Sequence, residues 1–250
     1  MSVPNLAHPF IPLTNKHVLY KYMERRWAEE AIHLGRLRIG TLNQFRAAEG
    51  VRGDTGEGEE IRVFHPTFAT GTDLPDWLPL TVEPGADPKS VTIQNLRLSR
   101  TQQVPDVYAF CCSTILTQEL NKRFGTDTVL RIEQPIAFLE LMTYGMLVNK
   151  HIDSPRYFQC PVFYRSRTFI HGDPLMGMPT AFLKPCDYWT EQEFRCLWRP
   201  RYRKILPVFL ANTCLCKHLS IVDPKHIPET SAPIMAPLSE SPASPASSTP

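Results

Sequence analysis

The sequence lacks a strong charge bias, a long apolar run and an export signal. Its 27 Lys and Arg residues nearly balance 25 Asp and Glu residues, and a formal charge of +2 does not by itself indicate a nucleic-acid or membrane partner. No segment reaches the ~18 apolar residues of a membrane helix. The best candidate, residues 135–148, is interrupted by Glu140. Residues 1–20 lack the basic and apolar regions of a secretory signal. We therefore expect a cytoplasmic protein with no membrane segment.

The seven cysteines form no Cys-x-x-Cys pair, which argues against a zinc knuckle or a redox motif. Without an export signal, we expect free thiols in a reducing compartment. Cys214, Cys216 and His218, with His226 downstream, are nevertheless zinc-ligand types. The alternation over residues 211–219 equally favours a strand that buries small cysteines. On balance the sequence predicts no bound metal.

Several catalytic motifs are also missing. The sequence contains no Gly-x-Gly-x-x-Gly after a strand, no P-loop ending in Gly-Lys-Ser or Gly-Lys-Thr, no Gly-x-Ser-x-Gly and no His-Glu-x-x-His. These absences argue against kinases, P-loop hydrolases, serine hydrolases and zincins.

What is present is the composition of a packed domain with many chain breaks, with 42% hydrophobic residues and 24 prolines. Apolar patterns predict strands over 17–22, 37–42, 61–68, 90–98, 107–113, 128–132, 160–165, 180–184, 194–198 and 208–210. Helices are expected over 24–34, which Gly35 would end, 116–124 and 135–147. Because the βα alternation is irregular, we expect an α+β fold. It would be a single domain, residues 1–227, with a mixed, largely antiparallel β-sheet and short flanking helices. Residues 228–250, rich in proline and serine, are expected to form a disordered C-terminal tail.

The sharpest polar motif is Glu191-Gln192-Glu193, directly before the apolar segment that starts at Phe194. In a strand the two carboxylates would share a face about 7 Å apart. Their repulsion would raise one pKa and prepare that group for acid–base or cation-stabilising chemistry. An exposed strand edge with solvated charges explains the same pattern, so both interpretations stay open.

Two further segments carry charge. Residues 50–60 are rich in glycine and acids, which is typical of an exposed loop, although oxygen ligands for a divalent cation are an alternative. Residues 195–204 contain no acid and a series of basic and aromatic side chains, Arg195, Trp198, Arg199, Arg201, Tyr202, Arg203 and Lys204. Such a patch suits RNA, single-stranded DNA or a nucleotide pyrophosphate, and equally a solvated face.

Several short motifs follow one another in a distinctive order. Leu19-Tyr20-Lys21-Tyr22 precedes a helix and then Gly-Arg-Leu-Arg-Ile-Gly-Thr-Leu-Asn-Gln-Phe-Arg over residues 35–46. An acidic segment with Asp54, Glu57 and Gly58 comes next, and residues 182–185, Tyr188 and residues 191–195 follow later. This order resembles a large group of uncharacterised bacterial and phage proteins, the domain of unknown function DUF2971. The resemblance covers most of residues 18–200.

That group is similar in layout to ADP-ribosyltransferase-like folds, in which an early strand holds NAD and a late strand carries the catalytic Glu. The resemblance implies that Glu193 is the catalytic carboxylate and that Glu191 positions the acceptor. It also implies contacts to NAD, bound as a substrate, by Tyr20, Lys21, Tyr22, Ser113 and Arg195. The early strand departs from the pattern, because it offers Lys21 in place of His or Arg, and Lys lacks the bidentate grip of Arg.

The leading hypothesis is therefore a nucleotide-handling protein, an NAD-dependent ADP-ribosyltransferase-like enzyme that acts in phage–host conflict. One alternative is a non-enzymatic nucleic-acid-binding module that uses residues 195–204. Another is a catalytically inactive scaffold that binds a partner.

Overall fold

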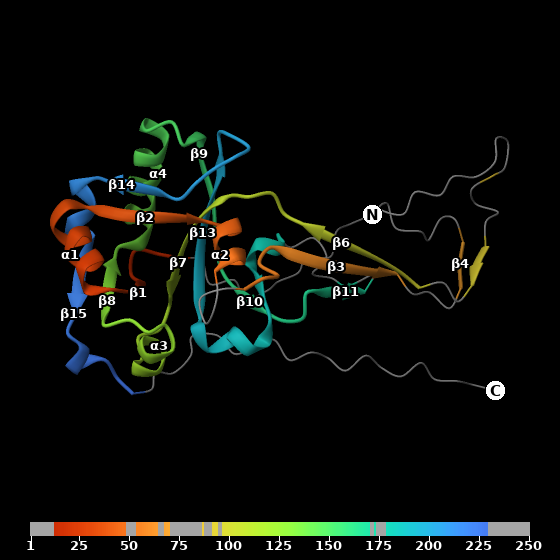
Figure 1. Ribbon diagram of the computed structural model, residues 1–250, viewed down its shortest axis with the longest axis horizontal. Coiled ribbons are helices and arrows are strands. Elements are labelled where there is room, and N and C mark those ends of the chain that lie inside the picture. The colour runs from red at the N-terminus through yellow and green to blue at the C-terminus, as the bar shows by residue number, and fades with distance from the viewer. Residues whose placement is uncertain are drawn as a thin grey trace.

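The computed structural model describes residues 13–48, 54–64, 68–70, 87, 92–94, 97–170, 173 and 179–229. Figure 1 shows a main body of sheet and helices, from which the strands β3 (Glu59–Phe64) and β6 (Leu98–Gln103) extend as an arm. The predicted tail, residues 228–250, lies outside the described residues except for its first two positions.

The main body is built on one eight-stranded sheet within the described residues. Its strands are β1 (Val18–Met23), β2 (Arg36–Thr41), β7 (Tyr108–Ser113), β8 (Thr128–Glu133), β9 (Ile152–Pro161), β13 (Glu193–Pro200), β14 (Val208–Ala211) and β15 (Leu219–Val222). The order is β14-β2-β7-β1-β8-β15, and β13 pairs with both β7 and β9. Every pair in this sheet is antiparallel.

Smaller sheets complete the architecture. Strand β3 lies between β6 and β11 (Thr168–Ile170), β4 (Phe68–Thr70) pairs with β5 (Thr92–Gln94), and β10 (Phe163–Tyr164) pairs with β12 (Leu183–Lys184). The pairs β10–β12 and β3–β11 are parallel. With its helices and its mixed, largely antiparallel sheets, the chain has the α+β fold that the sequence predicts.

Two helices, α1 (Arg25–Leu34) and α4 (Pro135–Val148), pack on one face of the main sheet and form the core with it. The expected helix stop is confirmed, because Gly35 has φ +61° and its N–H bonds to the Ala31 carbonyl. A Cβ at this position would lie 1.9 Å from the Asn212 carbonyl oxygen. Fully buried Trp198 of β13 donates a hydrogen bond to the Thr143 hydroxyl of α4 (2.8 Å), which ties sheet and helix together.

The remaining helical segments are short: α2 (Leu42–Ala47), α3 (Gln118–Arg123), and the 3₁₀ turns η3 (Thr180–Phe182), η4 (Cys186–Glu191), η5 (Thr213–His218) and η6 (Pro224–His226). The strand predicted over 180–184 is therefore wrong for its first three residues. The strand predicted over 211–219 is wrong at η5, where the Asn212 side chain accepts a hydrogen bond from the Cys214 N–H (3.0 Å) and starts a turn. None of the helices in the described residues is long and apolar enough to cross a membrane.

Candidate active site

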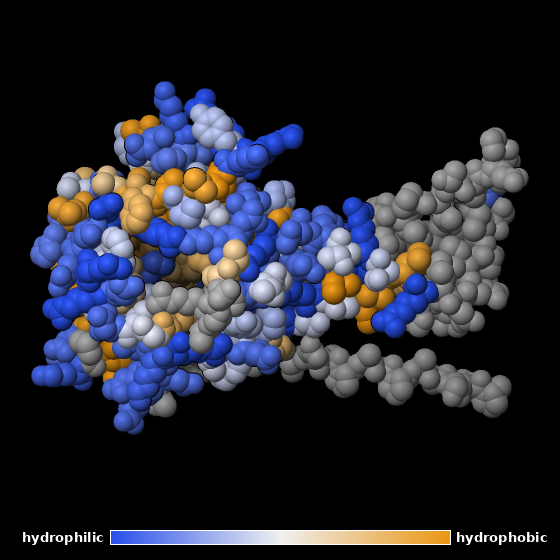
Figure 2. Space-filling view, in the orientation of Figure 1, coloured by the Kyte–Doolittle hydropathy of each residue, from blue (hydrophilic) through white to orange (hydrophobic). Residues whose placement is uncertain are grey.

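A cavity of about 460 Å³ opens between β1 and β2. Figure 2 shows a hollow in the molecular surface at this place. The volume is in the range of small-molecule sites. All residues that the sequence analysis assigns to the site line this cavity: Tyr20, Lys21, Tyr22, Ser113, Glu191, Glu193 and Arg195.

The cavity exists because β1 and β2 approach the same edge of β7 and then separate. Strand β13 pairs with the whole of β7 and occupies its other edge. On the shared edge, β2 pairs with Tyr108 and Ala109, and β1 pairs only with Ser113. Within the part of the chain that the structure describes, residues 110–112 of β7 therefore have no strand partner on this edge, and the space between the diverging strands forms the cavity.

Lys21 of β1 reaches into this gap. Its ammonium group donates a hydrogen bond to the Cys111 carbonyl oxygen (2.8 Å) and lies 4.4 Å from the centroid of the Phe110 ring. No ion pair joins Lys21 to an acid in the described part of the chain. The positive charge is thus held in the cavity wall without a carboxylate to neutralise it, which suits an anionic ligand.

The two glutamates enter the cavity from the junction of η4 and β13. Glu191 ends η4, Gln192 adopts a left-handed conformation (φ 42°), and Glu193 begins β13. The predicted common strand face is therefore wrong, because a left-handed residue separates the two. Register still places Glu193 opposite Ser113, which is in turn opposite Tyr20, so that these three residues lie in one row across the sheet.

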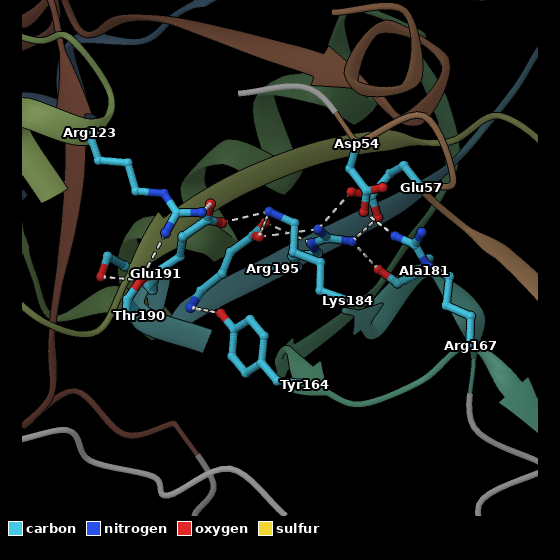
Figure 3. A network of polar contacts seen from close by, with 12 residues as sticks. Asp54, Glu57, Arg123, Tyr164, Arg167, Ala181, Lys184, Thr190, Glu191 and Arg195 are labelled. Carbon is cyan, nitrogen blue, oxygen red and sulfur yellow. Dashed lines mark hydrogen bonds and ion pairs between the residues drawn. The ribbon is translucent and has the colours of Figure 1, made fainter. Parts of the chain in front are cut away.

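A buried lysine brings the two carboxylates together (Figure 3). The ammonium group of Lys184, from β12, lies 2.6 Å from Oε2 of Glu191 and 2.9 Å from Oε2 of Glu193. Oε1 of Glu193 accepts a hydrogen bond from Nε of Arg195 (2.7 Å). Oε1 of Glu191 is buried without a hydrogen-bond partner among the described residues, and Nη2 of Arg123 lies 3.5 Å from it.

The pKa values of the two carboxyl groups move in opposite directions. Burial by itself would raise the pKa of Glu193, but the charges of Arg195 and Lys184 outweigh it and hold this pKa below its ordinary value. Burial raises the pKa of Glu191; Lys184 lowers it, but burial together with the nearby carboxylate of Glu193 outweighs this lowering. Glu193 is therefore a fixed anion, and Glu191 is the member of the pair that holds a proton more readily.

Arg195 is part of the site's internal structure and is not a free cation. Its guanidinium group is 2% exposed and bonds to Glu193, to Glu57 and to the Ala181 carbonyl. The bond from Nη2 to Oε2 of Glu57 is 2.9 Å. Glu57 thereby fixes the guanidinium group that in turn fixes Glu193.

The acidic segment is more deeply buried than a solvated loop. Among its described residues, Asp54 pairs with Arg167 and Glu60 accepts a hydrogen bond from the Thr180 hydroxyl (2.6 Å). Asp54 and Glu57, the latter on Arg195, serve as counter-ions, and they are buried together with Glu60, so the expectation of an exposed loop is wrong for these three acids. Sequence reasoning missed Glu57 and Lys184 as site residues, although both lie in the short motifs that carry the family resemblance.

Two of the three remaining candidates, Tyr22 and Ser113, are held by the backbone. The Tyr22 hydroxyl donates to the Ile115 carbonyl oxygen (3.1 Å) and accepts from the Thr117 N–H (2.9 Å), which fixes the ring. The buried Ser113 hydroxyl donates to the Glu191 carbonyl oxygen (2.7 Å) and holds η4 against β7.

The basic patch is smaller than the sequence indicates. Arg195 and Trp198 are buried, and the exposed cations are Arg199, Arg201, Arg203 and Lys204. For the zinc candidates, Cys214 is exposed, whereas the Cys216 thiol contacts the Ala31 carbonyl oxygen at 3.7 Å. In the described residues, no group of three or more His, Cys, Asp or Glu side chains has the arrangement of a metal site.

Comparisons of the chain with protein-family models, with curated proteins and with solved structures found no match.

Proposed function

We propose that the chain binds a nucleotide, with NAD as the leading candidate, in the cavity between β1 and β2 and transfers its ADP-ribosyl group. The observation that carries the proposal is the convergence of all seven predicted site residues on one cavity. They come from β1, β7, η4 and β13, so the chain must fold to bring them together.

The lining of the cavity matches the chemistry of a nucleotide. Aromatic rings, among them Tyr20 and Tyr22, offer faces for a base. Lys21 and Arg38, neither of which pairs with an acid in the described residues, offer charge for phosphates. The carboxylates of Glu191 and Glu193 offer acceptors for ribose hydroxyls.

In ADP-ribosyl transfer the bond between ribose C1′ and the nicotinamide nitrogen breaks, its electron pair leaves with nicotinamide, and a nucleophile of the acceptor bonds to C1′. The fixed charge of Glu193 stabilises the oxocarbenium-like centre. Glu191, with its raised pKa, accepts the proton that the nucleophile loses. Lys184 and Arg195 keep the two carboxylates in place.

Ligand binding tests the first step. We expect NAD and ADP-ribose at millimolar concentration to raise the melting temperature of the protein, because a ligand that binds only the folded state stabilises it. Absence of a shift with both ligands would contradict the proposal.

Turnover tests the second step, with nicotinamide release measured in the presence of a bacterial lysate as acceptor. We expect Glu191→Gln to lower the rate by about 10²–10³-fold, as when one preorganised group is removed from an active site. Glu140→Gln is the control, since Glu140 is exposed on α4 and does not line the cavity. No turnover by the wild type, or equal turnover by Glu191→Gln, would overturn the transferase proposal. NAD binding without turnover would instead favour the inactive scaffold.

A nucleic-acid-binding module remains the second candidate, supported by the four exposed cations at 199–204 and by Tyr202, which is 60% exposed beside them. Binding to single strands should then weaken steeply with salt. It should be lost in the triple variant Arg199→Ala, Arg201→Ala and Arg203→Ala, which leaves the cavity intact.

A further inference from the structure

A pair of aromatic rings stands at the β2 side of the cavity, and the proposed chemistry at the carboxylates does not use it. Trp27 of α1 and Phe209 of β14 both line the cavity. Their ring centroids are 5.9 Å apart and their planes are inclined by 35°. Phe209 is 46% exposed, so part of its ring surface is accessible to a ligand.

Positive charge surrounds these rings. The guanidinium group of Arg36 lies 4.7 Å from the centroid of Phe209, and that of Arg26 lies 4.6 Å from the centroid of Trp27. Both of these arginines also pair with acids. Arg38 is directly opposite Phe209 in the β2–β14 register and lines the same cavity. It pairs with no acid in the part of the chain that the structure describes.

A second pair of rings lies on the β1 side. Tyr22 and Phe124 line the cavity with their centroids 5.5 Å apart. This side adjoins the carboxylates, because Arg123, the neighbour of Phe124, lies 3.5 Å from Glu191. Lys21 occupies the gap between the diverging strands that carry the two sides.

The cavity therefore presents a ring pair on each wall and a cation between them. A mononucleotide has one ring system to place, whereas a dinucleotide has two ring systems joined by a doubly charged pyrophosphate. Only the second kind of ligand would use both ring pairs and the unpaired charges of Lys21 and Arg38 at once.

We infer that Trp27 and Phe209 form a second base-binding subsite, which stacks on the base of the nucleotide half remote from the carboxylates and makes the cavity selective for dinucleotides. The inference rests on the proposed function, because the reacting ribose is placed at Glu191 and Glu193. It adds the class of substrate and the residues that select it.

The test compares the dissociation constants of NAD and of nicotinamide mononucleotide for four forms of the protein by calorimetry. These forms are the wild type, Trp27→Leu, Phe209→Leu and the control Phe158→Leu. Phe158 is 64% exposed on β9 and does not line the cavity. Phe209→Leu is the main variant, since a half-exposed ring contributes less to folding than partly buried Trp27, and its melting temperature confirms that it is folded.

We expect Phe209→Leu and Trp27→Leu to weaken NAD binding about 10-fold or more, as for the loss of one stacked base. Binding of the mononucleotide should change less than about 2-fold, and Phe158→Leu should bind both ligands like the wild type. A purely structural role of the rings would weaken both ligands alike, so the ratio of the two affinities is the decisive readout.

The second subsite alone would be overturned if the wild type binds NAD and both ring variants bind it equally well. It would also be overturned if the ring variants lose affinity for NAD and for the mononucleotide to the same extent. Failure of the wild type to bind either ligand would overturn the proposed function and this inference with it.

Discussion

Glu193→Gln should destabilise the fold strongly, whereas Glu191→Gln should not. The two residues are nearly adjacent, both buried and both bonded to Lys184, so each variant is the control for the other. The contrast comes from the opposite directions in which the site moves the two pKa values.

The magnitude follows from the contacts that each substitution removes. Glu193 faces Arg195 at 2.7 and 3.1 Å and Lys184 at 2.9 Å. A glutamine would leave these cations short of one negative charge in a buried site, and its amide hydrogens would face their donors. Breaking a buried pair in this way costs about 3–5 kcal/mol of the free energy of unfolding.

Glu191→Gln resembles the protonated acid, and the raised pKa of Glu191 means that the fold disfavours its charged form relative to the unfolded chain. The amide oxygen, in the place of Oε2, can keep the hydrogen bond from Lys184. The amide nitrogen takes the place of Oε1, where the Arg123 guanidinium group is 3.5 Å away and makes no hydrogen bond that the substitution would break. We expect a cost of no more than about 1 kcal/mol, the net value of one hydrogen bond. Urea unfolding at neutral pH measures both values. An equal loss of unfolding free energy in the two variants, or a larger loss in Glu191→Gln, would refute the assignment of the fixed negative charge to Glu193.

The pH dependence provides a second check. A depressed pKa means that the ionised Glu193 stabilises the fold above the ordinary Glu pKa of about 4.3, and that this stabilisation is lost as the pH falls through the lower folded value. The gap between the wild type and Glu193→Gln should therefore be constant from about pH 8 to about pH 5.5 and shrink below about pH 4. The raised pKa of Glu191 has the opposite sign, so the wild type should gain stability over Glu191→Gln as the pH falls toward about 4.3.

Two further predictions concern Glu57 and the cysteines. Glu57→Gln should lower both the free energy of unfolding and NAD turnover, because it frees one side of the Arg195 guanidinium group. The control Glu59→Gln, at a partly buried neighbour, should change neither. Equal effects of the two variants in unfolding and turnover assays would argue against a role of Glu57 in positioning Arg195. Iodoacetamide at about pH 8, followed by peptide mass spectrometry, should label exposed Cys186 and Cys214 and spare Cys112, because burial raises the pKa of Cys112 to about 12. Labelling of Cys112 as fast as Cys214 in the folded protein would contradict its burial.

The parts of the fold that the sequence predicts are those with a local cause. Helix α1 has apolar residues at helical spacing and a glycine that alone tolerates the backbone at its end. Helix α4 begins with Pro135, whose missing N–H costs nothing in the first turn. Strand β7 is a short apolar run, and it lies in the centre of the sheet, where both faces are covered.

The parts that escape prediction depend on partners far along the chain. Residues 54–60 have the composition of a solvated loop, and only the fold supplies Arg167 as the counter-ion of Asp54 and Arg195 as that of Glu57. Arg195 has the sequence context of a basic patch, and its burial follows from the pairing of β13 between β7 and β9. Lys184 lies in one of the short motifs, but its role in the site becomes evident only in the fold, where η4 places Glu191 within hydrogen-bond distance of it.

The geometry also changes the chemical roles that we propose for Glu191 and Glu193. The family resemblance predicts Glu193 as the catalytic residue and Glu191 as its helper. Both oxygens of Glu193 are already bonded, Oε1 to Arg195 and Oε2 to Lys184 and Arg195. Oε1 of Glu191 makes no hydrogen bond to any residue that the structure describes, and the pKa of Glu191 is raised, as a proton acceptor requires. Within the proposed reaction, Glu191 is therefore the carboxylate that exchanges the proton, and Glu193 acts through its charge.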